Sequence, residues 1–132
     1  MTQQEKQLLL KDLCGRLPYH DLWVQYDNKD WLALGYGHER IELLSSIFSS
    51  VAGPCPLIDE IKPYLRPMLS MTEEEAIKYV TLTHYNTDDN GKPYRELTIE
   101  ATDWLNENHF DYRGLIKKGL AFEASKDMYK TK

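Results

Sequence analysis

The hydrophobic pattern of this chain changes its period after the first twenty residues, and that change most constrains the fold. Residues 3–14 place apolar side chains at helical spacing, whereas residues 22–36 alternate them along an extended chain. The helical stripe comprises Leu9, Leu10, Leu13 and Cys14. A helix followed by alternating strands predicts an α+β domain in which three to four short helices pack against a small antiparallel meander.

The meander is expected between residues 21 and 48. Alternation at Leu22, Val24 and Tyr26, the turn-prone sequence at residues 27–30 and the apolar run at residues 31–36 predict a β-hairpin. Alternation continues from Ile41 to Ile47, although residues 39–50 could also form a helix. We prefer a third strand there, because β-branched residues and serines favour it and no helix cap precedes it.

Capping signals mark the helices. Thr2 with Glu5 and Thr72 with Glu75 have the spacing of capping boxes, which predicts helices at residues 3–14 and 73–83. Gly15 is expected to end the first helix. The second helix is expected to bury its apolar side, which comprises Ala76, Ile77 and Val80.

The remaining segments are assigned from turn and breaker residues. A helix is expected at residues 99–109, followed by a short one that Asp111 caps and Gly119 ends. Residues 86–93 read as a polar loop. Two prolines exclude residues 62–66 from a helix and, if these residues pair, place them at a sheet edge.

Composition bounds the class of protein. The chain has 132 residues, of which 42% are hydrophobic and 28% charged, so we expect one domain spanning residues 1–132. The longest apolar runs are far shorter than a bilayer requires, and the polar start has no signal-peptide pattern. We therefore expect a cytoplasmic protein that does not enter a membrane, with Cys14 and Cys55 reduced.

Charge is unevenly distributed. The formal net charge is −5, but the segment from Asp111 onward carries six cations and three anions, leaving about +3 locally and −8 elsewhere. The net charge disfavours nucleic acid as the main partner. The basic tail from about residue 125 could be flexible and solvated, or it could contact an acidic partner.

Catalytic and metal-binding patterns are missing from the sequence. Residues 86–91 resemble the start of a calcium loop, yet position 12 is Leu97 instead of the bidentate Glu that such loops require. The histidines are scattered, and none has a second one at helical spacing. We therefore expect no catalytic residue, no metal and no cofactor.

The aromatic content is the remaining signal. Nine tyrosines and three tryptophans exceed what a core of this size hides easily, and such residues also occur at interfaces. Tyrosine beside arginine is typical of binding hot spots. The candidate partner-binding residues are Tyr64, Arg66, Tyr112, Arg113 and Lys117.

Three blocks of sequence resemble a family of small uncharacterised proteins encoded by gut Bacteroidales and by their phages or mobile elements. The blocks are LLLKDLCGRLPY at residues 8–19, IDEIKPYLRPMLSMTEEE at residues 58–75 and DWLNENHFDYRGLIKKGLAFEA at residues 103–124. Residues 21–56 resemble the family less. The resemblance supplies no catalytic residue and implies an intracellular accessory protein.

We accordingly expect a non-enzymatic module that binds a protein or a second copy of itself. Two alternatives stay open. The basic C-terminal segment could bind nucleic acid, with Tyr112 and Tyr129 stacking on bases. Trp23 and Trp31 could instead line an aromatic slot that holds a nucleotide or another small molecule.

Overall fold

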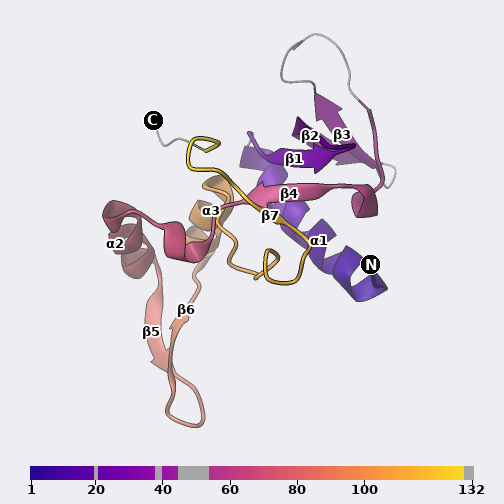
Figure 1. Cartoon of the computed structure of the whole chain (residues 1–132). Coiled ribbons are helices and arrows are strands. Elements are labelled where there is room, and N and C mark those ends of the chain that lie inside the picture. Colours follow the sequence, from indigo (N-terminus) through magenta and orange to yellow (C-terminus); the bar gives the residue numbers. More distant parts are fainter. Residues whose placement is uncertain (20, 38–39, 45–53, 130–132) are drawn as a thin grey trace.

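The chain folds as an α+β protein in the computed structural model, which describes residues 1–19, 21–37, 40–44 and 54–129 (Figure 1). The α-helices of this part are α1 (Gln3–Arg16), α2 (Glu73–Leu82) and α3 (Ile99–Glu107). One sheet contains β1 (Trp23–Tyr26), β2 (Lys29–Gly37), β3 (Arg40–Leu44), β4 (Lys62–Leu65) and β7 (Phe122–Glu123). A separate hairpin contains β5 (His84–Thr87) and β6 (Pro93–Glu96). The predicted fold class is confirmed.

The predicted meander forms one side of the five-stranded sheet, whose strand order is β3-β2-β1-β4-β7. β1 and β2 are joined by Asp27 and Asn28, both at positive φ (52° and 60°), as a type I′ hairpin turn requires. β3 pairs antiparallel with β2, so the preference for a strand over a helix is confirmed for residues 40–44. The rest of that predicted strand, residues 45–48, lies outside the described residues.

Helix α1 supplies one side of the core. Leu9 and Leu13 are fully buried and belong to the same apolar cluster as residues of β1 to β4. The prediction that Cys14 shares this face is wrong, because its side chain is exposed and the helix instead buries Asp12 and Arg16. Gly15 does not end the helix.

Gly15 lies where α1 and α3 approach each other closely. A Cβ at this position would lie 3.1 Å from the side-chain nitrogen Nδ2 of Asn106, which is closer than about nine in ten contacts that real Cβ atoms make. Its lack of a side chain therefore serves the packing of two helices. α3 also packs against α2, so it links the core helix α1 to α2.

Both predicted capping boxes are present. The Thr2 hydroxyl accepts from the Glu5 amide at 3.1 Å, and the Glu5 carboxylate accepts from the Thr2 amide at 2.8 Å. Thr72 and Glu75 repeat this arrangement at the start of α2. α3 begins after Thr98, whose hydroxyl accepts from the Ala101 amide.

The segment after Asp111 keeps its predicted capping groups without forming a helix. The Asp111 carboxylate accepts from the amides of Leu115 and Ile116, and the Leu120 amide donates to the Leu115 carbonyl in a Schellman ending. Gly114 has a φ of +73°, a left-handed conformation that interrupts any helix begun at residue 112. The prediction of a short helix here is therefore wrong.

Strand β4 is not at a sheet edge, which corrects a second prediction. It lies between β1, antiparallel, and β7, parallel. Val24 is the partner of Pro63 on β1, and the Tyr129 hydroxyl bridges the Trp23 amide and the Tyr64 carbonyl. The Tyr64 carbonyl thus faces β1, and because backbone groups alternate in direction along a strand, the Pro63 nitrogen faces β7. β7 pairs only from Tyr64 onward, and the missing N–H of Pro63 therefore breaks no ladder bond.

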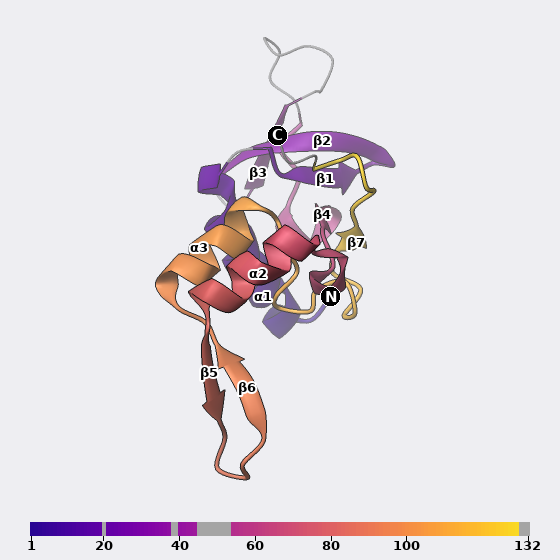
Figure 2. The ribbon, with the colours of Figure 1, turned by 90° about the vertical axis from the view of Figure 1, so that its left-hand side faces the viewer.

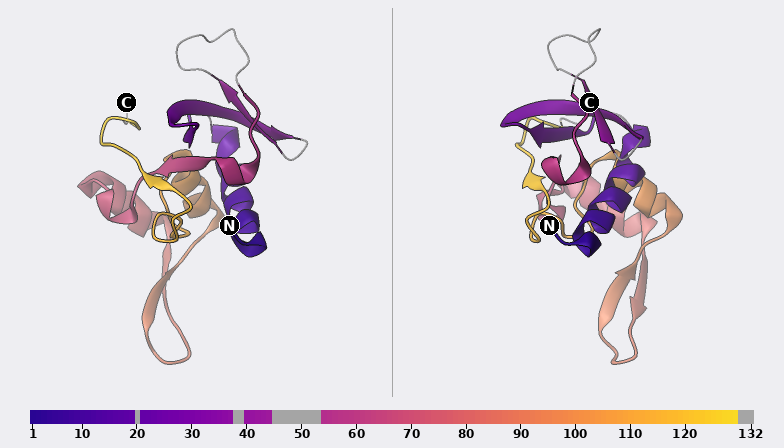
Figure 3. Two further views of the ribbon diagram at one scale, coloured as in Figure 1. Left: turned by 45° about the vertical axis from the view of Figure 1, so that its right-hand side comes forward. Right: turned by 90° about the vertical axis from the view of Figure 1, so that its right-hand side faces the viewer.

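Residues 84–96 form a hairpin where a polar loop was predicted. Every residue of β5 and β6 is exposed, and the pair extends away from the five-stranded sheet in all views (Figures 2 and 3). The hairpin leaves the body where α2 ends and α3 begins. There the Thr98 hydroxyl donates to the Leu82 carbonyl at 2.6 Å. Among the described residues, no helix has the length and hydropathy needed to cross a bilayer.

Candidate functional site

Arg66, one of the predicted partner-binding residues, is committed to an ion pair within the chain. Its two terminal nitrogens donate to the two carboxylate oxygens of Glu75 at 2.8 and 2.6 Å, and its guanidinium lies 4.2 Å from the centre of the Phe110 ring. Burial alone would raise the pKa of Glu75, but the hydrogen bonds from Arg66 and Thr72 outweigh it and hold that pKa below its ordinary value. This pair fastens the first turn of α2 to the end of β4.

Arg113 is committed in the same way. It donates to the Asp12 carboxylate at 2.8 Å, while Arg16 donates to both oxygens of that carboxylate at 2.8 and 3.0 Å. Arg16 is completely buried and also donates to the Phe110 carbonyl at 2.6 Å. Tyr112 lies beside both guanidinium groups, at 4.5 Å from Arg113. The cluster joins α1 to the segment that follows α3.

The remaining predicted residues differ in exposure. The Tyr64 hydroxyl donates to Asp30 and accepts from Gln25, whereas Lys117 is exposed. From the sequence, both tyrosine–arginine pairs, Tyr64 with Arg66 and Tyr112 with Arg113, are expected to be exposed on the surface. This expectation is wrong, since the side chains of Arg66 and Arg113 expose only 15% and 18% of their surface. Whether these residues bind a partner stays a prediction.

The tyrosines predicted to stack on bases are also engaged. Tyr129 packs its ring 4.7 Å from the His109 ring, and its hydroxyl accepts from the Trp23 amide and donates to the Tyr64 carbonyl, both at 2.8 Å. Burial raises the pKa of this hydroxyl far above its usual range. The basic C-terminal segment is thus anchored as far as Tyr129. Its described lysines, Lys117, Lys118 and Lys126, are exposed.

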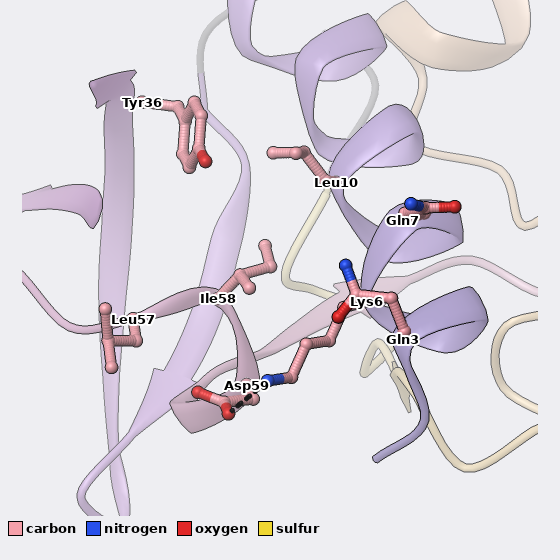
Figure 4. Close-up of a pocket in the computed structure, with 8 residues that line it drawn as sticks. All are labelled: Gln3, Lys6, Gln7, Leu10, Tyr36, Leu57, Ile58 and Asp59. Atoms are coloured by element: carbon pink, nitrogen blue, oxygen red, sulfur yellow. Dashed lines mark ion pairs between the residues drawn. The ribbon is translucent and has the colours of Figure 1, made fainter. Parts of the chain in front are cut away.

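We consider two clefts that described residues line. One, of about 350 Å³, lies between α1 and the 3-10 helix at Ile58–Glu60 (Figure 4). Leu10, Ile58 and Tyr36 form its apolar side, and the one cation in its lining, Lys6, is paired with Asp59 at 3.2 Å. Among the described residues that line this cleft, that pairing leaves no free cation to hold the phosphate of a nucleotide.

The second cleft, of about 760 Å³, lies between the start of α2 and residues 123–129. Its cations are Arg66, which is paired with Glu75, and the exposed Lys126. Neither cleft includes Trp23 or Trp31 in its lining, so the predicted aromatic slot does not coincide with these two clefts.

The calcium-like loop uses its oxygens within the hairpin. The Asp88 carboxylate accepts from the amides of Asn90 and Lys92, both at 2.9 Å, and Gly91 takes a φ of +77°. The described residues contain no group of three or more acidic, histidine or cysteine side chains placed to hold a metal ion. His20 and His38 lie outside the described residues.

The apolar side of α2 faces solvent, which contradicts the prediction that it is buried. Ala76 is exposed, and Ile77 and Val80 expose 63% and 48% of their surface, while Glu75 is the buried residue of the helix. Glu75 pairs with Arg66, so the side of α2 that faces the body carries Glu75 together with the half-buried Tyr79 and Leu82. Sequence periodicity could not reveal this, because it shows that a helix has an apolar side without showing what covers it.

We call residues 72–107, which comprise α2, the hairpin and α3, the arm. Exposed apolar and aromatic side chains recur along it: Ile77, Val80, Tyr85, Tyr94, Leu97 and Ile99. The arm carries nine acidic and three basic residues, a net charge of −6, which leaves +1 for the remaining residues of the chain. The negative charge of this protein is therefore concentrated on the part that also exposes apolar side chains.

Comparisons with protein-family models, with curated proteins and with solved structures find no match to this chain. The arm is therefore identified as the candidate site by its exposure and charge alone.

Proposed function

We propose that the chain is a non-enzymatic protein-binding module and that the arm carries its binding surface. The observation that supports this most directly is the apolar side of α2. Ile77 and Val80 are neighbours at i and i+3 on this side, and they expose 63% and 48% of their surface. Contiguous exposed apolar side chains cost solubility and commonly mark interaction surfaces.

The hairpin supports the same proposal. A two-stranded hairpin without other contacts is marginally stable, and β5 and β6 bury none of their residues against the body. Such an element contributes little to the core of this chain. Exposed Tyr85 and Tyr94 supply instead the aromatic contact area that is common in interfaces.

Photo-cross-linking tests the proposal. A benzophenone amino acid replaces Ile77 in the full chain, which is then expressed and irradiated in the cells that encode it. We expect a discrete cross-linked protein, because this side chain would lie inside the interface. The matched control carries the same amino acid at Leu34, an apolar residue of β2 that exposes 52% of its surface but lies outside the arm.

A second variant ties the cross-link to the surface. Val80→Lys places a charge one turn from the probe, so the adduct from position 77 should disappear while the protein stays folded. Adducts of equal yield from positions 34 and 77, or none from position 77, would contradict the proposal.

A further inference from the structure

We infer that the partner of the arm is a basic amphipathic helix, whose apolar side chains pack on Ile77 and Val80 and whose lysines or arginines face the carboxylates of α3. This inference rests on the proposed function and names the chemistry of the partner. It depends on three features of the arm: the stripe on α2, the stripe on α3 and the blocked edges of the hairpin.

The first feature is the outward stripe of α2. Glu73, Ile77 and Val80 are spaced at i, i+4 and i+7, so they form one continuous line along the helix. All three are exposed, and the buried Glu75 lies on the opposite side of the helix. This stripe presents an apolar centre with a carboxylate at its end.

The second feature is an acidic stripe on the neighbouring helix. Glu100, Asp103 and Glu107 are spaced at i, i+3 and i+7 along α3 and are all exposed, while Ala101 and Leu105 bury the other side. α2 and α3 pack against each other and lie side by side in Figure 2. Each of these two neighbouring helices thus carries an exposed stripe, with an apolar centre on α2 and with carboxylates on α3.

The carboxylates of this acidic stripe also act on a residue outside the arm. Burial raises the pKa of the Tyr19 hydroxyl, and the Asp103 and Glu107 carboxylates raise it further. Exposed arm residues comprise eight carboxylates and three cations, so a partner with positive charge is favoured. Two arms would repel each other, and nucleic acid would be repelled as well.

The third feature concerns the edges of the hairpin. The Asp88 amide donates to the Lys92 carbonyl across the hairpin. Backbone groups alternate in direction along a strand, so those of the next pair, Thr87 and Pro93, point away from the partner strand and toward the outer edges of the hairpin. The Thr87 amide already donates to the side-chain oxygen of Asn86 at 2.9 Å, and Pro93 has no N–H to donate. An added strand would therefore find each edge interrupted, which favours a partner that binds through side chains, as a helix does.

Peptide titration of the isotope-labelled full chain tests this inference. The probe is a peptide of about 18 leucines and lysines patterned as an amphipathic helix. One control peptide has glutamate in place of lysine. The other control has the same leucines and lysines as the probe, but its leucines are spread around the helix. In about 0.15 M NaCl, only the patterned lysine peptide should shift amide signals, and these should belong to α2, the hairpin and α3.

Variants of the chain separate the two contributions. Ile77→Ser with Val80→Ser, and separately Glu100→Gln with Asp103→Asn and Glu107→Gln, should each weaken binding at least about tenfold. Matched controls outside the arm are Leu34→Ser and the triple change Asp27→Asn, Glu42→Gln and Glu123→Gln, all at exposed positions. These controls should bind like the unaltered chain.

Several results would overturn the inference: equal binding of the glutamate peptide, equal binding of the unpatterned lysine peptide, shifts outside the arm, or equal losses in the control variants. Failure of this titration is distinguishable from failure of the proposed function. If position 77 cross-links to a partner but the chain does not prefer the patterned lysine peptide, the basic helix is excluded and the proposed protein-binding function still stands. A partner that proves to be a second copy of the chain likewise excludes the basic helix.

Discussion

Asp12 joins two arginines that come from opposite ends of the chain. Arg16 lies one turn further along α1, and Arg113 lies in the segment after α3. Removing a buried charge from water is costly, so such a cluster stabilises a fold mainly when all its members are present. Among the described residues, the Asp12 carboxylate is the anion that both guanidinium groups contact.

Asp12→Asn should therefore be strongly destabilising. The variant keeps the shape of the side chain but leaves Arg16, which is completely buried, without a negative charge beside it. We expect the free energy of unfolding to fall by about 3–5 kcal/mol, measured by urea denaturation. Lys6→Met is the control, because the pair of Lys6 with Asp59 is about one-third exposed and its loss should cost less than about 1 kcal/mol. Equal effects of the two substitutions would contradict this role of Asp12.

Tyr129 completes the hydrogen bonding between β1 and β4. Its hydroxyl lies between the Trp23 amide and the Tyr64 carbonyl, where a direct ladder bond would otherwise form. Tyr129→Phe leaves both backbone groups unpaired, so the free energy of unfolding should fall by about 1–3 kcal/mol. Tyr85→Phe, at an exposed position, should change it by less than about 0.5 kcal/mol. If Tyr129→Phe is as stable as the unaltered chain, β1 and β4 must form the direct hydrogen bond between the Trp23 amide and the Tyr64 carbonyl once the hydroxyl is gone.

At the scale of elements, the sequence predicted those features that depend on neighbours along the chain. Thr2 with Glu5, and Thr72 with Glu75, form their capping boxes because the four backbone groups involved lie within one turn. The Schellman ending at Gly119 likewise forms without the helix that was expected before it. The burial of α2 was mispredicted because it depends on Arg66, nine residues away and on another element.

Glu75 should make stability depend on pH in a definite direction. Its pKa is lower in the folded state than the ordinary value of 4.5, so its contribution is fully present above pH 4.5 and is lost as pH falls through the lower folded-state pKa. Glu75→Gln should lower the free energy of unfolding by about 1–3 kcal/mol at neutral pH, and by less in acid.

Denaturant unfolding at several pH values measures this difference. Glu74→Gln is the matched control, because Glu74 occupies the same helix turn but is exposed, and its effect should stay below about 0.5 kcal/mol. A gap between Glu75→Gln and the unaltered chain that persists unchanged in acid would mean that Glu75 acts through packing and not through its charge.

For the whole molecule, the sequence predicted the sheet better than the site. The β1–β2–β3 meander follows from alternation and a two-residue turn, which are local signals. The hairpin β5–β6 was missed because HYNT and PYRE are short and almost wholly polar or aromatic. The candidate site was missed for a related reason: Ile77 and Val80 look like core residues until the partner of Glu75 is known.

The hairpin should be dispensable for the folding of the rest of the chain. Replacing residues 85–95 with Asn-Gly keeps His84 opposite Glu96 and supplies a two-residue hairpin turn in place of the exposed strands. Because the removed residues are all exposed and the bond from Thr98 to Leu82 remains, the free energy of unfolding should change by less than about 1 kcal/mol. Urea denaturation and circular dichroism measure this, with unaltered protein as reference.

The same variant separates a folding role of the hairpin from a binding role. If Tyr85 and Tyr94 contribute to the interface, the cross-link from position 77 should weaken while stability is kept. In the chain that carries the probe at position 77, Val80→Ser should weaken the cross-link too, since this substitution changes an exposed side chain and leaves the core intact. If the shortened chain unfolds at a much lower urea concentration, the hairpin stabilises the packing of α2 and α3. If the shortened chain cross-links at full yield, the interface is restricted to these two helices.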